Sequence, residues 1–428
     1  MGMLDIVAAG SKKGRRKIEK LCRRGEDLLD AEVLAQAGRI VDLVRRGGDR
    51  ALVKTVRRYD GVRVSEIAEL RLHPELAPEG LAPGLEEALG RAIAAVERYH
   101  RRQVRGGFQL DENGIMLEER VRPLRRVGIY VPGGRAAYPS SVLMTVIPAR
   151  LAGVEEIVVA TPPAAWSASA ALRHALARLE VKEIWGLGGA HAVAALAYGT
   201  ESVARVDKIV GPGNVWVTAA KHLVRGAVAI DSLAGPSEVL IVASAGAEPE
   251  LVAADLLAQA EHDPRALALL VTDDKKLARA VAGALGRQVG DLATAATARA
   301  AIAGQGTAFV VGSMDEAAAI ADALAPEHLQ LVGAAAEALA DRVTNAGAIF
   351  VGASTPEVFG DYVAGPSHVL PTAGTARFAS ALGVPDFVRR GHVIRFDRAA
   401  AARWAEAAAV IADVEGLPAH AAAARRRL

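Results

Sequence analysis

Strand-like and helix-like segments alternate along most of this chain, and this alternation constrains the fold more than any other feature. From Arg126 onward, short apolar runs bounded by glycine or proline are followed by stretches with apolar residues at helical spacing. This pattern is typical of βαβ units, in which helices join parallel strands and cover both faces of a sheet. We therefore predict an α/β protein. The expected strands are 127–131, 156–160, 182–186, 208–210, 239–242, 267–271, 308–311, 329–332 and 348–351.

The two ends of the chain have a different pattern. Residues 1–120 show apolar residues at helical spacing, and the residues from Phe387 onward are rich in alanine. Both regions are therefore expected to be helical. The loop 231–238, which contains Gly235–Pro236–Ser237, separates two runs of alternating segments and is the expected domain boundary.

Composition excludes several classes of protein. The 428 residues carry 51 Lys and Arg against 49 Asp and Glu, and this balance argues against a nucleic-acid-binding protein. Cys22 is the only cysteine, so an internal disulfide and a cysteine-based metal site are excluded. No run approaches the roughly 18 apolar residues of a membrane span, and the first ten residues do not form a signal sequence. We expect a cytoplasmic enzyme without a membrane partner.

The usual nucleotide-binding signatures are missing. No Walker-type sequence is present, and the glycine turn 186–191 has His191 where a dinucleotide fingerprint has its third glycine. Asp207 follows at about the expected distance, but it precedes a strand instead of ending one. A second glycine turn, 211–214, also follows a strand and opens a helix. Either turn can present backbone N–H groups to a ligand, or can be a tight turn only.

Several polar side chains are candidates for metal binding or proton transfer. Gln259 and His262 are three residues apart at the end of an expected helix, so they share a face where zinc could bind; a structural histidine is the alternative. Glu327 and His328 precede a strand and supply two proton-transfer groups, or a surface ion pair. Asp361 lies in a glycine-rich stretch and is a possible metal ligand.

The C-terminal tail contains a further candidate. His420 lies in the segment 415–420, within an otherwise alanine-rich region. A tail with ligand-type residues can reach a distant site or a partner subunit. The alternative is a solvated helix.

Taken together, these segments resemble the histidinol dehydrogenase family over almost the whole chain. The resemblance is carried by segments in the family's order: 130–134, 195–200, 211–214, 234–238, 259–264, 326–329, 360–362, 368–372 and 415–420.

The resemblance implies two incomplete Rossmann-like domains with small helical segments at the two ends. Residues 27–128 and 238–380 would form the first domain with the catalytic and metal residues, and 129–237 the second, NAD-binding domain. Residues 1–26 would form an N-terminal helical arm, and 381–428 a C-terminal helical tail that reaches the partner subunit of a homodimer.

The resemblance also implies the activity: oxidation of L-histidinol to L-histidine, through the aldehyde, with two NAD⁺ and one zinc ion per subunit. This reaction is the last step of L-histidine biosynthesis. By resemblance, zinc is bound by Gln259, His262, Asp361 and His420, and Glu327 and His328 are the catalytic residues. The same metal-site residues, with Ser237, His328 and Glu415, would contact the substrate. Tyr130, His191 and Asn214 would contact NAD; the family more often has Gln at position 191.

Three other functions are compatible with parts of this pattern. A related zinc- and NAD-dependent dehydrogenase of another small alcohol, such as a sulfonated diol, would share Glu327 and His328. It should lack the acidic partner for the substrate ammonium, and the presence of Glu415 favours histidinol. A zinc hydrolase without NAD and a non-catalytic relative are the remaining alternatives. Formation of NADH from histidinol and NAD⁺ separates them.

Overall fold

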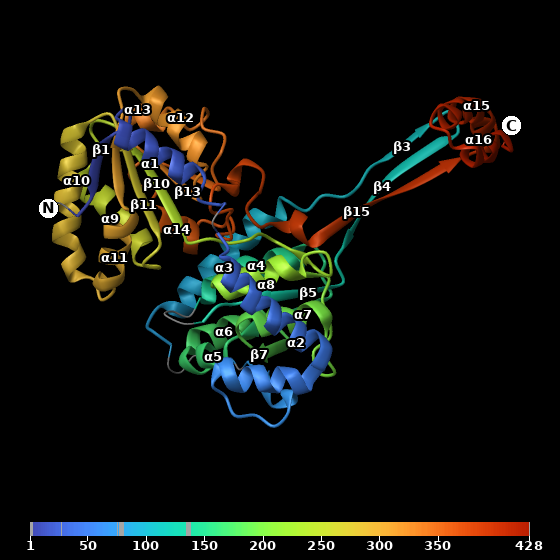
Figure 1. The fold of residues 1–428 in the computed structure, drawn as a ribbon, viewed down its shortest axis with the longest axis horizontal. Coiled ribbons are helices and arrows are strands. Elements are labelled where there is room, and N and C mark those ends of the chain that lie inside the picture. Colours follow the sequence, from blue (N-terminus) through green and yellow to red (C-terminus); the bar gives the residue numbers. More distant parts are fainter. Residues whose placement is uncertain (1–2, 27, 75, 77–80, 134–137, 428) are drawn as a thin grey trace.

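The computed structural model describes residues 3–26, 28–74, 76, 81–133 and 138–427. Two six-stranded sheets, each covered by helices, form the body of the molecule, and a thin arm extends from it (Figure 1). The α/β prediction is therefore confirmed. No described helix is both long and apolar enough to span a membrane.

The first sheet is entirely parallel, with strand order β1-β12-β11-β10-β13-β14. Alternate residues of β10 enter different cores, because successive side chains of a strand point to opposite faces. Val239 and Ile241 pack with α9, α10 and α11, whereas Leu240 and Val242 pack with α12 and α1. The strands are β1 (Asp5–Ala8), β10 (Glu238–Ala243), β11 (Leu267–Thr272), β12 (Thr307–Val310), β13 (His328–Val332) and β14 (Ala348–Val351). The helices are α1 (Lys12–Cys22), α9 (Pro249–Ala260), α10 (Lys275–Gln288), α11 (Ala295–Gln305), α12 (Met314–Leu324), α13 (Ala334–Glu337) and α14 (Glu357–Tyr362).

The second sheet has the order β2-β7-β6-β5-β8-β9, and only the pairing of β2 with β7 is antiparallel. One face is covered by α2, α7 and α8, and the other by α3, α4 and α6. The strands are β2 (Arg71–Leu72), β5 (Arg126–Tyr130), β6 (Glu156–Thr161), β7 (Glu183–Gly186), β8 (Lys208–Val210) and β9 (Ala229–Ile230). The helices are α2 (Ala31–Thr55), α3 (Leu85–Arg101), α4 (Pro139–Leu151), α5 (Pro163–Ala168), α6 (Ala170–Arg178), α7 (Gly189–Tyr198) and α8 (Val215–Val224).

The arm is built from segments far apart in the sequence. A three-stranded antiparallel sheet, in the order β15-β4-β3, leads to two packed helices at its tip (Figure 1). Its elements are β3 (Gln109–Glu112), β4 (Ile115–Pro123), β15 (Val388–Phe396), α15 (Arg398–Val414) and α16 (Pro418–Arg425).

The chain ends contain more strand than expected. The prediction of helix alone is wrong for β1 to β4 near the start and for β15 near the end. The strands of the arm lack a fully buried face; most residues of β4 and β15 are at least partly exposed, so they carry no continuous apolar run.

The packing of the N-terminal half also differs from the expected domain division. Helix α2 shares a core with α7 and α8, and β2 pairs with β7, so these parts of 27–128 cover the second sheet and not the first. Residues 1–26, expected as a helical arm, contribute β1 and α1 to the first sheet. Chain order alone does not reveal this, because a helix can cover either neighbouring sheet. Whether the two halves fold as independent domains stays a prediction.

Candidate active site

A pocket of about 450 Å³ lies between the two six-stranded sheets. The second sheet contributes the loops that follow the carboxyl ends of β5 and β8, including Gly133 and Asn214. The first sheet contributes residues at the amino ends of its strands, since Ser237 precedes β10 and Glu327 precedes β13. The pocket thus joins the carboxyl edge of one sheet to the amino edge of the other.

The second sheet reverses its strand order where it meets the pocket. From β5 the chain proceeds to β6 on one side, whereas β8 lies on the other side. Ligands of open α/β sheets bind at such a switch point, outside the carboxyl ends of the strands. Gly211, directly after β8, has a φ of 110°, and a Cβ there would lie 2.2 Å from the Tyr130 carbonyl oxygen. A glycine is therefore required for the loop to leave the sheet at this point.

Glu327 and His328 lie together at the amino end of β13, where this strand pairs with β10. Both side chains are buried, and both bond to the backbone of Glu238. The Glu238 N–H donates to Glu327 Oε2 at 2.8 Å, and His328 Nδ1 lies 2.9 Å from the Glu238 carbonyl oxygen. Since a carbonyl only accepts, Nδ1 carries a proton, and Nε2 is the ring nitrogen that can exchange a proton with the pocket.

The electrostatic surroundings of this pair raise both pKa values. Burial raises the pKa of Glu327 to about 8, although His328 and the Glu238 N–H oppose the change. Burial alone would lower the pKa of His328, but the carboxylates of Glu327 and Asp361 raise it to about 10. His328 Nε2 has no hydrogen-bond partner and lies 3.7 Å from Asp361 Oδ1. The pair therefore presents two proton-transfer groups to the pocket, and the raised pKa of each favours its protonated form.

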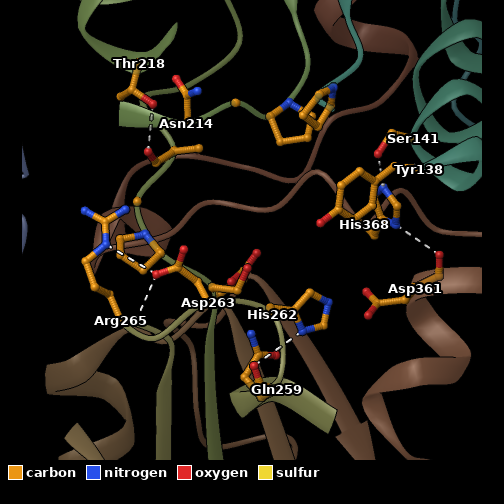
Figure 2. Close-up of a pocket in the computed structure, with 18 of the residues that line it drawn as sticks. Tyr138, Ser141, Asn214, Thr218, Gln259, His262, Asp263, Arg265, Asp361 and His368 are labelled. Atoms are coloured by element: carbon orange, nitrogen blue, oxygen red, sulfur yellow. Dashed lines mark hydrogen bonds and ion pairs between the residues drawn. The ribbon is translucent and has the colours of Figure 1, made fainter. Parts of the chain in front are cut away.

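Three of the four expected metal ligands lie in the same pocket. Gln259 and His262 come from the end of α9, and Asp361 comes from α14 (Figure 2). His262 Nδ1 donates to the Ala258 carbonyl at 3.0 Å, which leaves Nε2 as its metal-binding atom. Such a backbone hydrogen bond is typical of histidines that bind metals. The donor set of amide oxygen, imidazole nitrogen and carboxylate fits zinc.

The fourth expected ligand lies elsewhere in this chain. His420 is on α16 and Glu415 follows α15, both at the tip of the arm, away from the pocket (Figure 1). Over the described ranges, no three His, Cys, Asp or Glu side chains gather closely enough to hold a metal. The described part of the chain thus brings three of the four expected ligands into one pocket and leaves His420 apart.

The three expected NAD contacts have different surroundings. Asn214 lines the pocket and caps α8, where its Oδ1 accepts from Trp216 N–H and Val217 N–H. Tyr130 is buried and its hydroxyl accepts from Gly189 N–H at 3.1 Å. His191 is buried, with Nε2 2.8 Å from Asp60 Oδ2. Neither Tyr130 nor His191 is among the residues that line the pocket.

The pocket also contains residues for which the sequence predicted no role. His368 donates from Nδ1 to the Asp361 carbonyl at 3.0 Å, and its Nε2 lies 3.3 Å from the Ser141 hydroxyl (Figure 2). His368 belongs to the family-like segment 368–372, and this segment was the sequence signal that could have identified it as a site residue. Tyr138 and Ser141 also line the pocket and come shortly after the family-like segment 130–134. Gly134, the last residue of that segment, lies outside the described residues.

Glu357 was also missed by the sequence analysis. It lies four residues before Asp361 on α14 and is 1% exposed. Both ends of the Gln259 amide form hydrogen bonds in one of its two orientations. In that orientation its nitrogen donates to Glu357 at 3.1 Å and its oxygen accepts from Glu238 N–H at 3.2 Å. Burial raises the pKa of Glu357 well above its usual value.

The fold and the pocket define an α/β enzyme whose acid–imidazole pair lies opposite the switch point of a parallel sheet. Comparison with known proteins identifies its family: the family model "Histidinol dehydrogenase" matches residues 23–428. A histidinol dehydrogenase of a Synechococcus species is 46% identical, with 99% of each chain covered. One from Geobacillus kaustophilus is 46% identical over 91% of this chain and 92% of its own. A crystal structure of histidinol dehydrogenase from Elizabethkingia anophelis superposes with a TM-score of 0.90 at 30% identity, covering 100% of this chain and 98% of that one.

The chain therefore belongs to the histidinol dehydrogenase family, and it is an NAD-dependent oxidoreductase. The resemblance stated from the sequence is confirmed.

Proposed function

We propose that this protein oxidises L-histidinol to L-histidine through L-histidinaldehyde, with reduction of two NAD⁺. The observation that carries the proposal is the buried Glu327–His328 pair, which shares one pocket with Gln259, His262 and Asp361. The family membership gives the substrate class, and this pocket provides the proton-transfer groups that both oxidations need.

Gln259, His262 and Asp361 are the residues of this pocket that would hold zinc, with His420 of a second chain as the fourth ligand. Zinc bound there would fix the imidazole and amine of histidinol and so hold the reacting carbon in place. NAD⁺ bound at the loops of the second sheet, with Asn214 among its contacts, would accept one hydride in each oxidation. The roles of Tyr130 and His191 towards NAD stay predictions.

His328 acts as the base of the alcohol step. Its Nε2 takes the hydroxyl proton as the carbon gives up hydride, and the product is the aldehyde. The Asp361 carboxylate raises the pKa of this imidazole. A cation bound to Asp361 would offset that charge and favour the neutral imidazole that the step requires.

Glu327 serves the second oxidation. Its carboxylate takes a proton from water as the water oxygen bonds to the aldehyde carbon, which gives the anion of the hydrate. This anion loses hydride to NAD⁺, and the carboxylic acid that forms then loses a proton to give the carboxylate product. Ser237 lines the pocket directly before β10 and would contact the substrate.

The arm would complete the site of a second subunit in a homodimer. Its helices have a small alanine core of their own and leave large apolar side chains exposed. Contiguous patches of exposed large apolar side chains mark interaction surfaces. The exposed large apolar residues of α15 and the turn after it are Trp404, Val410, Ile411, Val414 and Leu417. In this arrangement Glu415 attracts the substrate ammonium and His420 binds the metal.

The test is an assay of NADH formation with histidinol and NAD⁺, with and without a chelator. Two NADH per histidinol are expected, and the chelator should abolish both. No NADH from the metal-loaded protein would overturn the proposal.

A sulfonated diol serves as the comparison substrate. Arg265 is the only Lys or Arg among the described pocket residues, and it is paired with Asp263 at 3.3 Å. A sulfonate would need a free cation, so we expect no turnover of the diol.

A further inference from the structure

Glu238, the first residue of β10, contacts both proposed catalytic residues through its backbone. Its N–H donates to Glu327 Oε2 and its carbonyl accepts from His328 Nδ1. When the Gln259 amide is oriented towards Glu357, the same N–H is also 3.2 Å from the Gln259 oxygen. The backbone of one residue, through the two peptide groups that flank Glu238, therefore sets the orientation of the catalytic carboxyl group and holds a proton on Nδ1 of the imidazole.

The side chain of Glu238 is held by an ion pair outside the pocket. Arg24 Nε donates to Oε1 and Arg24 Nη2 donates to Oε2, each at 2.6 Å. The Ala373 N–H donates to Oε1 at 3.0 Å. The two side chains are 14% and 4% exposed, so water competes little with this bidentate pair.

All three nitrogen atoms of the Arg24 guanidinium form hydrogen bonds, and Arg24 is not part of the pocket lining. Its Nη1 donates to the Leu21 carbonyl at 2.8 Å, near the end of α1. Neighbouring Gly25 packs on the Ala373 carbonyl, where a Cβ would lie 2.7 Å from the oxygen. The segment after α1 and the segment around Ala373 thus enclose the Glu238 carboxylate from two sides.

Strand pairing alone does not explain a carboxylate at this point. The register of β10 with β11 and β13 is maintained by backbone hydrogen bonds, and the following residues of β10 are apolar. A buried ion pair adds little stability compared with an apolar pair of the same volume, but it fixes direction, because a guanidinium fork bonds a carboxylate in one plane.

We propose that Arg24 is a positioning residue for the catalytic pair. It fixes the Glu238 carboxylate, and through it the backbone N–H that orients Glu327 and the backbone carbonyl that keeps a proton on His328 Nδ1. This inference rests on the proposed function, since it assigns a role towards the residues of that reaction.

The test uses Arg24→Met and Arg24→Lys, with Arg23→Met as the matched control. Arg23 carries the same charge one residue earlier, but its ion pair with Glu26 is exposed. The Arg24→Met variant should reduce kcat by about 10- to 100-fold in both the alcohol and the aldehyde step, because small displacements of catalytic groups have effects of this size. Its KM for histidinol and its zinc content should stay near wild type. Arg24→Lys, which keeps the charge but loses the fork, should recover part of kcat, and Arg23→Met should match wild type.

Two results would overturn the proposal. One is an Arg24→Met variant that melts at a lower temperature but keeps wild-type kcat. The other is a loss of kcat that follows loss of zinc. If Arg24→Met does not fold, Arg24→Lys decides alone: wild-type kcat in that variant contradicts the need for a fork.

A ¹⁵N NMR measurement of the histidine tautomers separates this inference from the proposed function. The signal of His328, assigned with His328→Asn, is recorded on the zinc-loaded proteins without substrate, because a cation on Asp361 favours the neutral imidazole. It should show Nδ1–H in the wild type and a mixed tautomer in Arg24→Met. If the wild type does not oxidise histidinol but the tautomer shifts, the proposed function is wrong and the positioning role stands. An unchanged tautomer contradicts the positioning role whatever the activity.

Discussion

At the scale of residues, Glu327 and His328 are neighbours in the chain with different roles in the pocket. Glu327 is held by a backbone N–H and is fully enclosed, which raises its pKa to about 8. His328 presents a free Nε2. The two side chains are therefore expected to serve different proton transfers and to be separable by mutation.

We expect Glu327→Gln to impair the aldehyde step much more than the alcohol step, because an amide cannot take a proton from water. His328→Asn should show the opposite bias. Each variant is measured with histidinol and, separately, with histidinaldehyde, and an effect of about 100-fold or more is expected on the step affected. Equal losses on both steps in both variants would contradict this division of roles.

His262→Asn should lower zinc content and activity together, because it removes the imidazole nitrogen that points into the pocket. We expect at least about a tenfold loss of zinc affinity, measured by metal analysis after dialysis. His222→Asn, at a histidine outside the pocket, is the control. Full zinc occupancy in His262→Asn would contradict the ligand assignment.

Residue types with specific chemistry were identified from the sequence, but their supporting contacts were not. Glu327, His328, Gln259 and His262 stand in short local patterns, and the structure brings them into one pocket. Glu238 was missed as a residue with a role of its own, because its contribution comes from its backbone and from a partner 214 positions away. No local pattern encodes such a contact.

At the scale of elements, an ion network connects three adjacent strands of the second sheet. Arg126 on β5 donates to Glu156 on β6 at 2.6 Å and to Glu183 on β7 at 2.7 Å. Burial would raise the pKa of Glu183, but the bonds from Arg126 and Trp185 outweigh it and the net pKa is lowered. The ionised form of Glu183 therefore stabilises this sheet.

Glu183→Gln should lower the free energy of unfolding by about 1–2 kcal/mol at pH 7. The pKa of Glu183 is lower in the folded state than in the unfolded state. Its contribution is thus complete above the unfolded value and is lost as the pH falls through the folded value. The wild type and the variant should converge in denaturant titrations at low pH. Glu250→Gln, at an exposed pair with Arg287, is the control; a constant difference at every pH would contradict the argument.

Elements whose own sequence carries an apolar pattern were predicted correctly. Elements that depend on pairing with a distant segment were not. Helix α9 (Pro249–Ala260) ends next to Gln259 and His262, where the end of a helix was expected; a proline begins it and its apolar residues face the first sheet. Strand β15 was expected to be helical because it lacks a buried face and depends on pairing with β4.

At the scale of the whole molecule, the separation of His420 from the pocket makes the dimer testable. In a mixture of Glu327→Gln chains and His420→Ala chains, a mixed dimer has one site in which both residues are intact. Random pairing should restore about a quarter of the wild-type activity. Each variant alone should be almost inactive.

The contrasting arrangement gives a different result. If Glu327 and His420 act within one chain, the mixture stays inactive. The exchange is followed by the assay and by native mass spectrometry, which separates mixed dimers from the two homodimers by mass.

The arm has a consequence for how the protein responds to dilution. Because its tip has only a small core and much uncovered apolar surface, self-association would order the arm and complete the ligand set in one event. Specific activity would then fall at low protein concentration, and the rate would rise faster than linearly with the amount of chain. Newly made chains would gain their catalytic competence only after meeting a second copy.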